Sequence, residues 1–164
     1  MIGYFEDVQV GFELPLGCHT FSAEEIIAFA KEFDPQVFHL SNEGAQGTHF
    51  GRLCASGWHT ASMYMSMLVR TFQEQDEKIL RQGKPLAKRG PSPGFEDLRW
   101  IRPVFAGDTI TYKSVVSAKT ESRSRPEWGI IHAENHGTNQ NGEPVFFFKS
   151  NVFLERRPAH NSAA

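Results

Sequence analysis

The segment Leu53–Gln73, which reads LCASGWHTASMYMSMLVRTFQ, sets the architecture that the sequence predicts. It contains no proline, and apolar residues recur every three or four positions at Trp58, Ala61, Met65, Leu68 and Phe72. This is the spacing of one face of an α-helix. Further apolar residues, Met63 and Met67, lie on another side, so we expect a long helix largely enclosed by other elements. The charged run 74–78 marks its expected end.

Four strand-like segments follow this helix. They span residues 95–104, 109–120, 128–138 and 144–154, with turn signals at Gly107-Asp108 and Asn141-Gly142. Asn-Gly is a strong signal for a tight turn between antiparallel strands. An antiparallel sheet buries such a helix on one face by curling around it. The sequence therefore predicts an α+β fold, in which an antiparallel β-sheet wraps around a long central helix. The free edges of this sheet favour a homodimer or a dimer-based oligomer.

A shorter helix is predicted upstream. Ser22 and Glu25 have the spacing of a capping box, and an apolar stripe follows as far as Phe33. The helix should end there, because Pro35 keeps Asp34 out of the helical region. A β-like opening spans residues 8–20, and residues 42–52 and 79–94 are expected to be loops. We expect one domain over residues 1–154 and a frayed tail over residues 155–164.

The composition excludes several classes of protein. Of the 164 residues, 40% are hydrophobic and 22% are charged, and the net charge is −2. These values are typical of a folded globular protein and give no electrostatic basis for nucleic-acid binding. No apolar run approaches the length of about 20 residues that spans a bilayer, and the first residues lack the pattern of a signal peptide. With only two cysteines, we expect a cytoplasmic protein without membrane or nucleic-acid partners.

The segment Asp34-Pro-Gln-Val-Phe-His39 places a carboxylate and an imidazole five residues apart. In a regular helix or strand these two side chains would point in different directions, but a turn at Pro35 allows them to converge. Such a pair suits proton transfer, since the ordinary pKa is about 3.9 for Asp and about 6.5 for His. Alternatively, Asp34 caps the turn and His39 makes only a local hydrogen bond.

The segment Ala55-Ser-Gly-Trp-His59, at the start of the long helix, is the second candidate. Glycine costs roughly 1 kcal/mol relative to alanine within a helix, so Gly57 indicates that a ligand or another backbone needs the space. The free amides at a helix N-terminus also favour an anion or a polarised carbonyl oxygen. Close packing of the helix on the sheet explains the same glycine equally well.

The remaining candidates are weaker. His132 and His136 would share a strand face but have no third ligand, so we expect no metal site. Cys54 is expected to be a small core residue, and His49 is either ligand-facing or on the surface. The basic residues of the second loop are expected to be solvated; they are Arg81, Lys84, Lys88 and Arg89. There is no GxGxxG, Walker A, CxxC or GxSxG motif, so nucleotide hydrolysis, Rossmann redox chemistry and serine hydrolysis lack support.

Three separated segments together resemble the MaoC-like dehydratases of the hotdog superfamily. They are Asp34–His39, then FGRLCASGWHT at residues 50–60, then GFEDLRWIRPV at residues 94–104 followed by Gly107-Asp-Thr109. The opening residues 4–11 fit the same pattern, so the resemblance covers residues 4–154. It implies a single hotdog fold.

The resemblance also implies an acyl-thioester hydratase/dehydratase related to the (R)-specific enoyl-CoA hydratases. In that family an Asp and a His, here Asp34 and His39, activate the water that adds across the α,β double bond of an enoyl-CoA. The amide of a glycine, here Gly57, polarises the thioester carbonyl. The neighbouring residues are expected to contact the substrate; they are Gln36, Phe38, Ser56, Trp58 and His59. Where the family pattern has Asn followed by Pro, this chain has Gln36 and Val37, so the third polar partner stands on a longer side chain.

No metal or redox cofactor is implied, and CoA or acyl carrier protein enters only as part of the substrate. The family is typically dimeric or larger. Two other functions stay open: thioester hydrolysis by a carboxylate, and binding of acyl thioesters without catalysis. The presence of both Asp34 and His39 favours hydration over these alternatives.

Overall fold

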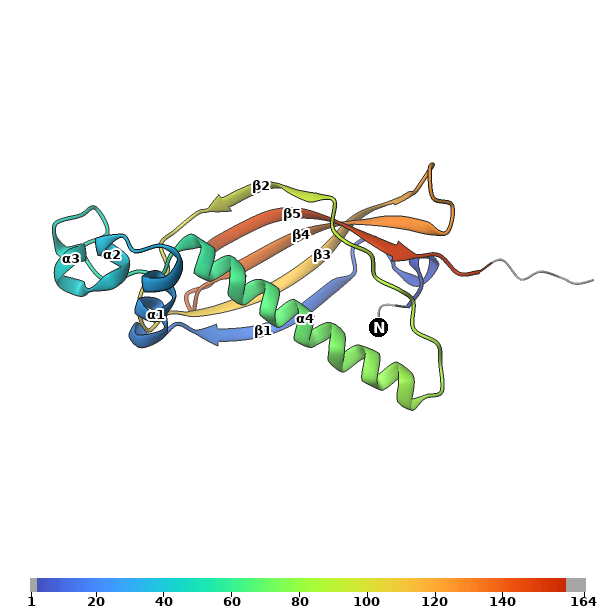
Figure 1. Cartoon of the computed structure of the whole chain (residues 1–164), viewed down its shortest axis with the longest axis horizontal. Coiled ribbons are helices and arrows are strands. Elements are labelled where there is room, and N and C mark those ends of the chain that lie inside the picture. Colours follow the sequence, from blue (N-terminus) through green and yellow to red (C-terminus); the bar gives the residue numbers. More distant parts are fainter. Residues whose placement is uncertain (1–2, 159–164) are drawn as a thin grey trace, which may run out of the picture.

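The fold is a five-stranded antiparallel sheet with one long helix across a face, and a computed structural model describes residues 3–158 of it (Figure 1). In chain order the elements are η1 (Phe5–Asp7), β1 (Glu13–Thr20), α1 (Ala23–Phe33), α2 (Val37–Leu40), α3 (Asn42–Gln46), α4 (Gly57–Arg81), β2 (Gly94–Trp100), β3 (Thr109–Glu121), β4 (Trp128–Thr138) and β5 (Pro144–Glu155). The strand order is β1-β3-β4-β5-β2. The three short helices lie at one end of the sheet, beside the N-terminus of α4. The predicted α+β architecture is confirmed.

The long helix α4 extends further than predicted. It ends at Arg81 rather than near Gln73, because the charged residues that follow Gln73 are good helix formers. An ion pair one turn apart, between Arg81 and Glu77 at 3.1 Å, lies in this last part. The chain leaves the helix just before Gly83, which has a positive φ of 69°. The loop that follows therefore covers residues 82–93.

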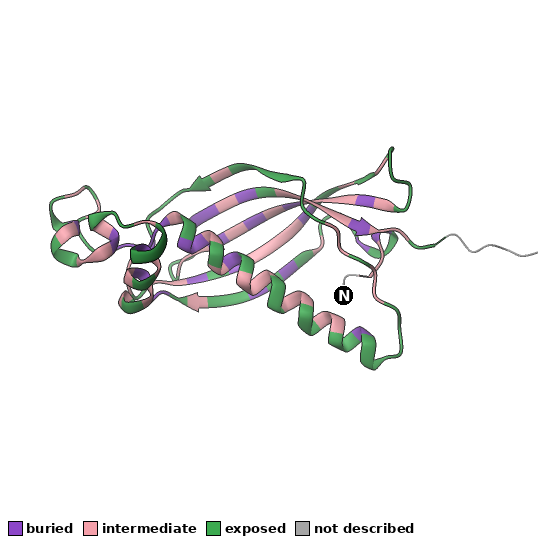
Figure 2. Cartoon of the chain, in the orientation of Figure 1, coloured by how far each residue is buried: buried purple, intermediate pink, exposed green. Residues whose placement is uncertain are grey.

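Only one face of α4 is buried, as Figure 2 shows. Tyr64 packs against the sheet and is 1% exposed, whereas Trp58 and Met65 are 53% and 50% exposed. The prediction of a largely enclosed helix is therefore wrong for the single chain. The broad apolar stripe in the sequence combines residues that face the sheet with residues that face away from it.

A polar network ties the middle of α4 to three strands. Asn135 of β4 is fully buried, and its side-chain oxygen accepts hydrogen bonds from the hydroxyls of Tyr64 and, at 2.8 Å, Ser114. Its amide nitrogen donates to Ser150 Oγ at 3.0 Å and to the carbonyl of Phe148 at 3.2 Å. Because each of these buried groups has a partner, the network adds specificity to an otherwise apolar core.

The shorter elements partly follow the prediction. Helix α1 begins and ends as expected, and Ser22 Oγ accepts from the Glu25 amide at 3.2 Å, although the Glu25 carboxylate pairs with His19 and not with the cap. The predicted loop over 42–52 instead begins with α3, whose cap is Ser41. Strand β1 starts only at Glu13, after η1, and β2 ends at Trp100, short of the predicted position 104.

The prediction of a frayed tail from residue 155 is wrong for residues 155–157. Glu155 belongs to β5, and Arg156 forms ion pairs with Glu6 at 3.2 Å and Glu121 at 3.1 Å. Arg157 pairs with Asp7 at 2.5 Å. These contacts attach the end of β5 to the start of the chain. Residues 159–164 lie outside the described residues.

Candidate active site

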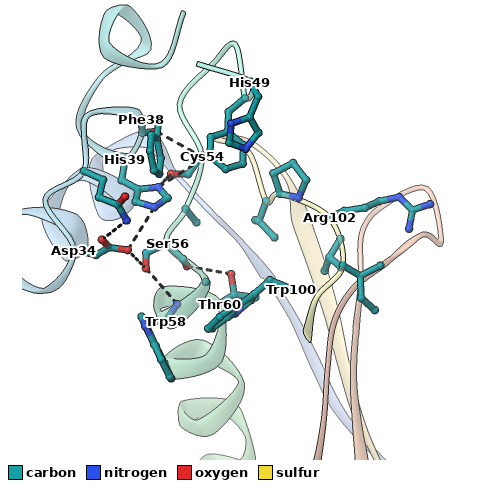
Figure 3. A pocket seen from close by; sticks show the side chains of 18 residues that line it. Asp34, Phe38, His39, His49, Cys54, Ser56, Trp58, Thr60, Trp100 and Arg102 are labelled. Atoms are coloured by element: carbon teal, nitrogen blue, oxygen red, sulfur yellow. Dashed lines mark hydrogen bonds and ion pairs between the residues drawn. The ribbon is translucent and has the colours of Figure 1, made fainter. Parts of the chain in front are cut away.

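A sharp turn after α1 brings the predicted Asp–His pair together. Asp34 leaves the helix with φ −155° and ψ 69°, and the chain re-enters helical structure at Val37, so that His39 faces back toward Asp34 (Figure 3). His39 Nε2 lies 3.4 Å from Asp34 Oδ2. Both side chains line a cavity of about 510 Å³ at the N-terminus of α4. The convergence that Pro35 made possible is therefore present.

Two side chains hold the Asp34 carboxylate. The Ser56 hydroxyl donates to Oδ2 at 2.7 Å, and the Gln36 amide donates to Oδ1 at 2.8 Å. Burial opposes ionisation, but these two hydrogen bonds and the electrostatic effect of nearby His39 outweigh it and lower the pKa of Asp34 below its ordinary value. Asp34 is therefore an ionised acceptor at neutral pH, with Gln36 beside it where the family pattern has Asn.

A hydrogen bond from the other ring nitrogen, Nδ1, fixes the orientation of His39. Nδ1 lies 2.7 Å from the carbonyl oxygen of Cys54, which can only accept, so Nδ1 carries a proton. Nε2 of this 5% exposed imidazole is then the ring nitrogen that faces Asp34.

Cys54 lies behind His39, with Sγ 3.7 Å from Nδ1. Burial raises the pKa of the Cys54 thiol to about 11, so it is protonated at neutral pH and is not a nucleophile. The expectation of a small core residue is confirmed, since Cys54 is 1% exposed. Its carbonyl also gives it a role in orienting the histidine.

Gly57, the first residue of α4, has an intramolecular explanation. A Cβ atom at this position would overlap with the indole of Trp100 in β2. The space that glycine leaves at this position is therefore occupied by a side chain of the same molecule, the indole of Trp100. The backbone amide of Gly57 is a separate matter: within residues 3–158 no acceptor is bonded to it, as is usual in the first turn of a helix, and Gly57 lines the cavity.

Of the other residues expected to contact substrate, four line the cavity and one does not. Gln36, Phe38, Ser56 and Trp58 are on its wall. His59 lies outside the lining, 5% exposed, with its ring stacked on Phe29 at 4.6 Å and edge-on to Phe21 at 5.0 Å. Burial is the main cause that lowers the pKa of His59, so the ring is neutral at neutral pH.

The cavity is also lined by residues outside the predicted catalytic and substrate-contacting set. Trp100, Ile101, Arg102, Pro103 and Val104 form one side, and His49, Phe50, Thr60 and Val145 complete it. Residues 100–104 belong to the third segment that resembles the family, and this resemblance is the sequence feature that points to them. Because they lie far from Asp34 along the chain, no local pattern predicts that they line the same cavity.

Within residues 3–158 no group of three or more His, Cys, Asp or Glu side chains is placed to hold a metal ion. His132 is instead bonded to Thr120 at 2.9 Å and to Asn151 at 2.6 Å. No helix in the same range is long and apolar enough to cross a membrane.

The geometry supplies three elements of acid–base chemistry on an acyl compound. A carboxylate and an imidazole face one point, so a water bound there would meet an acceptor and a proton-exchanging nitrogen. The unbonded Gly57 amide at a helix N-terminus can donate to a carbonyl oxygen that gains negative charge. The rest of the lining is largely apolar and aromatic, which suits an acyl group.

Comparisons with known proteins identify the family and the fold of this chain. The family model of the MaoC like domain matches residues 10–134. The MaoC-like dehydratase from Rhodospirillum rubrum is similar in structure, with a TM-score of 0.80 and 39% identity over 94% of this chain and 98% of that chain. The (R)-hydratase from A. caviae, which is involved in PHA biosynthesis, shares the fold, with a TM-score of 0.62 and 24% identity over 90% and 97% of the two chains.

A curated relative is similar over a shorter stretch. Mesaconyl-CoA hydratase from Cereibacter sphaeroides is 34% identical over 64 residues, which are 39% of this chain and 18% of that protein. The match thus spans less than a fifth of the length of that relative. The family model, in contrast, covers most of this chain, and the chain therefore belongs to the MaoC-like domain family and has the hotdog fold.

Proposed function

We propose that the protein is a hydro-lyase that adds water reversibly across the α,β double bond of an enoyl thioester. The observation that carries this proposal is the approach of His39 Nε2 to Asp34 Oδ2 in a cavity that the Gly57 amide also lines. Membership of a family that includes proteins named hydratases and dehydratases supports the class of reaction.

In this proposal His39 carries the proton and Asp34 is its electrostatic partner. The oxygen of a water held by Asp34 and His39 forms a bond to the β-carbon, and one water proton passes to His39 Nε2. The electron pair of the double bond moves toward the thioester carbonyl, which becomes an enolate. The imidazolium then returns its proton to the α-carbon, which completes the 3-hydroxyacyl thioester. The Asp34 carboxylate stabilises the imidazolium between these steps.

The Gly57 amide is the proposed donor to the enolate oxygen. A donor that is already oriented in the absence of substrate stabilises charge in the transition state without reorganisation. The N-terminal end of α4 adds a partial positive charge at the same place. CoA or acyl carrier protein would carry the acyl group.

A panel of enoyl-CoA thioesters tests this function. We expect the absorbance of the conjugated thioester to fall with wild-type protein, and Asp34→Asn and His39→Gln each to slow the reaction by about 10²- to 10⁴-fold. Release of free thiol would indicate thioester hydrolysis instead. Thioester binding without turnover of any substrate would indicate a binding protein, and variants as fast as the wild type would remove the assigned residues.

We also propose that the protein forms a homodimer through the free edge of β2. In this sheet β2 pairs only with β5 among the described strands, and three large apolar residues in this strand or directly after it, Phe95, Trp100 and Ile101, are 57%, 45% and 43% exposed. Sedimentation should give twice the chain mass for the wild type and a lower mass for Phe95→Lys. A monomeric wild type at micromolar concentration would contradict this.

A further inference from the structure

An apolar groove of about 120 Å³ runs along α4 beyond the catalytic cavity. Its walls include Ala61 and Met65 of α4, Phe95 and Leu98 of β2, and Phe148 of β5. Among the described residues, Trp58 is the one that borders both this groove and the catalytic cavity. The groove thus begins where the cavity ends, on the other side of one indole ring.

The indole of Trp58 is in contact with that of Trp100. The ring centroids are 5.1 Å apart and the planes meet at 76°, which is an edge-to-face contact without space for a methylene chain between the rings. Trp100 in turn packs on the Cα of Gly57, so it cannot move toward α4. In Figure 3 both indoles lie at the α4 end of the cavity, below the Asp34–His39 pair.

The route beneath α4 is also closed. Thr60 and Val145 form the inner wall of the cavity and are 2% and 1% exposed. Behind them Tyr112 is fully buried, and its hydroxyl donates to the carbonyl of Thr60 at 3.0 Å. A chain of methylene groups therefore meets packed side chains in this direction.

We infer that Trp58, held by Trp100, is a specificity-determining residue that limits the acyl group to short chains. The inference rests on the proposed function, because it assumes that the acyl group enters the cavity beside Gly57. A short enoyl group fits between the catalytic pair and the two indoles, whereas a longer one would have to displace the Trp58 ring to reach the apolar groove.

Two measurements test this inference. The first is kcat/KM for enoyl-CoAs of four, six, eight and ten carbons. We expect the wild type to decline steeply beyond six carbons, and Trp58→Ala to shift the ratio of ten- to four-carbon substrate on the order of tenfold or more toward the longer chain. Val69→Ala, an exposed position on the same helix that does not line either space, should leave the ratio unchanged.

The second measurement is calorimetric binding of saturated butyryl-, hexanoyl- and decanoyl-CoA, which cannot be hydrated. The affinity of Trp58→Ala should increase from six to ten carbons while that of the wild type does not, and adding Met65→Trp, which fills the groove, should abolish the increase. A wild type that gains affinity or rate with every added pair of carbons would overturn the inference, as would a Trp58→Ala protein that binds the three thioesters with the wild-type pattern. If both proteins bind the three thioesters with the predicted chain-length pattern but no substrate is hydrated, the proposed reaction is rejected, while acyl entry beside Gly57 and the length limit set by Trp58 are retained.

Discussion

The Ser56 hydroxyl donates a 2.7 Å hydrogen bond to Oδ2 of Asp34 and also accepts one from the Trp58 amide at 3.2 Å. A single 1% exposed side chain therefore caps α4 and holds the carboxylate that follows α1. This contact connects the start of α4, where the Gly57 amide lies, to the Asp34–His39 pair. The sequence predicts that Ser56 contacts the substrate; in the structure its hydroxyl positions the Asp34 carboxylate.

Ser56→Ala should move the pH dependence of activity. The hydrogen bond from Ser56 lowers the pKa of Asp34, so its loss raises that pKa, and the acid limb of kcat/KM moves to higher pH. A pH profile with a short enoyl-CoA measures the shift. Thr71→Ala removes a hydroxyl bonded to a helix carbonyl away from the cavity and should keep the wild-type profile. An unchanged acid limb in Ser56→Ala would count against an ionised Asp34.

Gly57→Ala should destabilise the protein because of Trp100. The added Cβ overlaps with the indole, and overpacking of this kind costs about 1–3 kcal/mol. In the Trp100→Ala background the obstacle is gone, so Gly57→Ala should cost little free energy of unfolding relative to Trp100→Ala alone. Urea unfolding of the four proteins of this cycle provides the measurement. Equal losses in Gly57→Ala with and without Trp100 would mean that the indole is not what the glycine accommodates.

His59→Phe should reduce the loss of stability in mild acid. Burial lowers the pKa of His59 in the folded protein; His19 adds to this effect, and nearby Glu25 offsets only part of it. In the unfolded chain the same histidine binds a proton near its ordinary pKa of about 6.5. The unfolded state therefore holds more protons below that pH, and stability falls as pH drops from about 7 toward the folded-state pKa. Phenylalanine keeps the stack on Phe29 without titrating. The free energy of unfolding, compared between pH 7.5 and 5.5, should fall less in the variant; identical falls would exclude His59 as a contributor.

Asn135→Ala should cost more stability than Tyr64→Phe. The first leaves the buried hydroxyl of Tyr64 without its partner, at about 1–3 kcal/mol, and also removes the partner that the half-buried Ser114 and Ser150 share. The second removes one hydroxyl and leaves the Asn135 oxygen still accepting from Ser114, at a cost of about 1 kcal/mol. Denaturant unfolding compares the two. Losses of equal size would mean that the network does not act as a unit.

Much of the fold follows from local patterns. The limits of α1 depend on Ser22 and Pro35, and those of β4 on the turn residues around it, so a single sequence is sufficient to place them. The charged run after Gln73 does not mark the end of α4, because such residues form helix readily, and the helix continues to Arg81. Burial of α4 was overestimated, since periodicity does not reveal which apolar residues face the sheet.

In the site, too, local contacts are predictable from the sequence, whereas contacts between distant segments are not. The turn at Pro35 was enough to predict that Asp34 and His39 converge, because their separation is local. The contact between Gly57 and Trp100 joins residues 43 positions apart and depends on how β2 lies beside α4, which no local pattern encodes. For the same reason the sequence did not distinguish His59, buried between Phe21 and Phe29, from its neighbours on the cavity wall.

A crystal structure of the Asp34→Asn variant with a short enoyl-CoA tests the central proposal most directly. We expect the thioester oxygen to accept a hydrogen bond from the Gly57 amide, and one water to lie within reach of residue 34, His39 Nε2 and the β-carbon. A thioester bound with its carbonyl away from Gly57, or with the β-carbon facing away from His39, would contradict it.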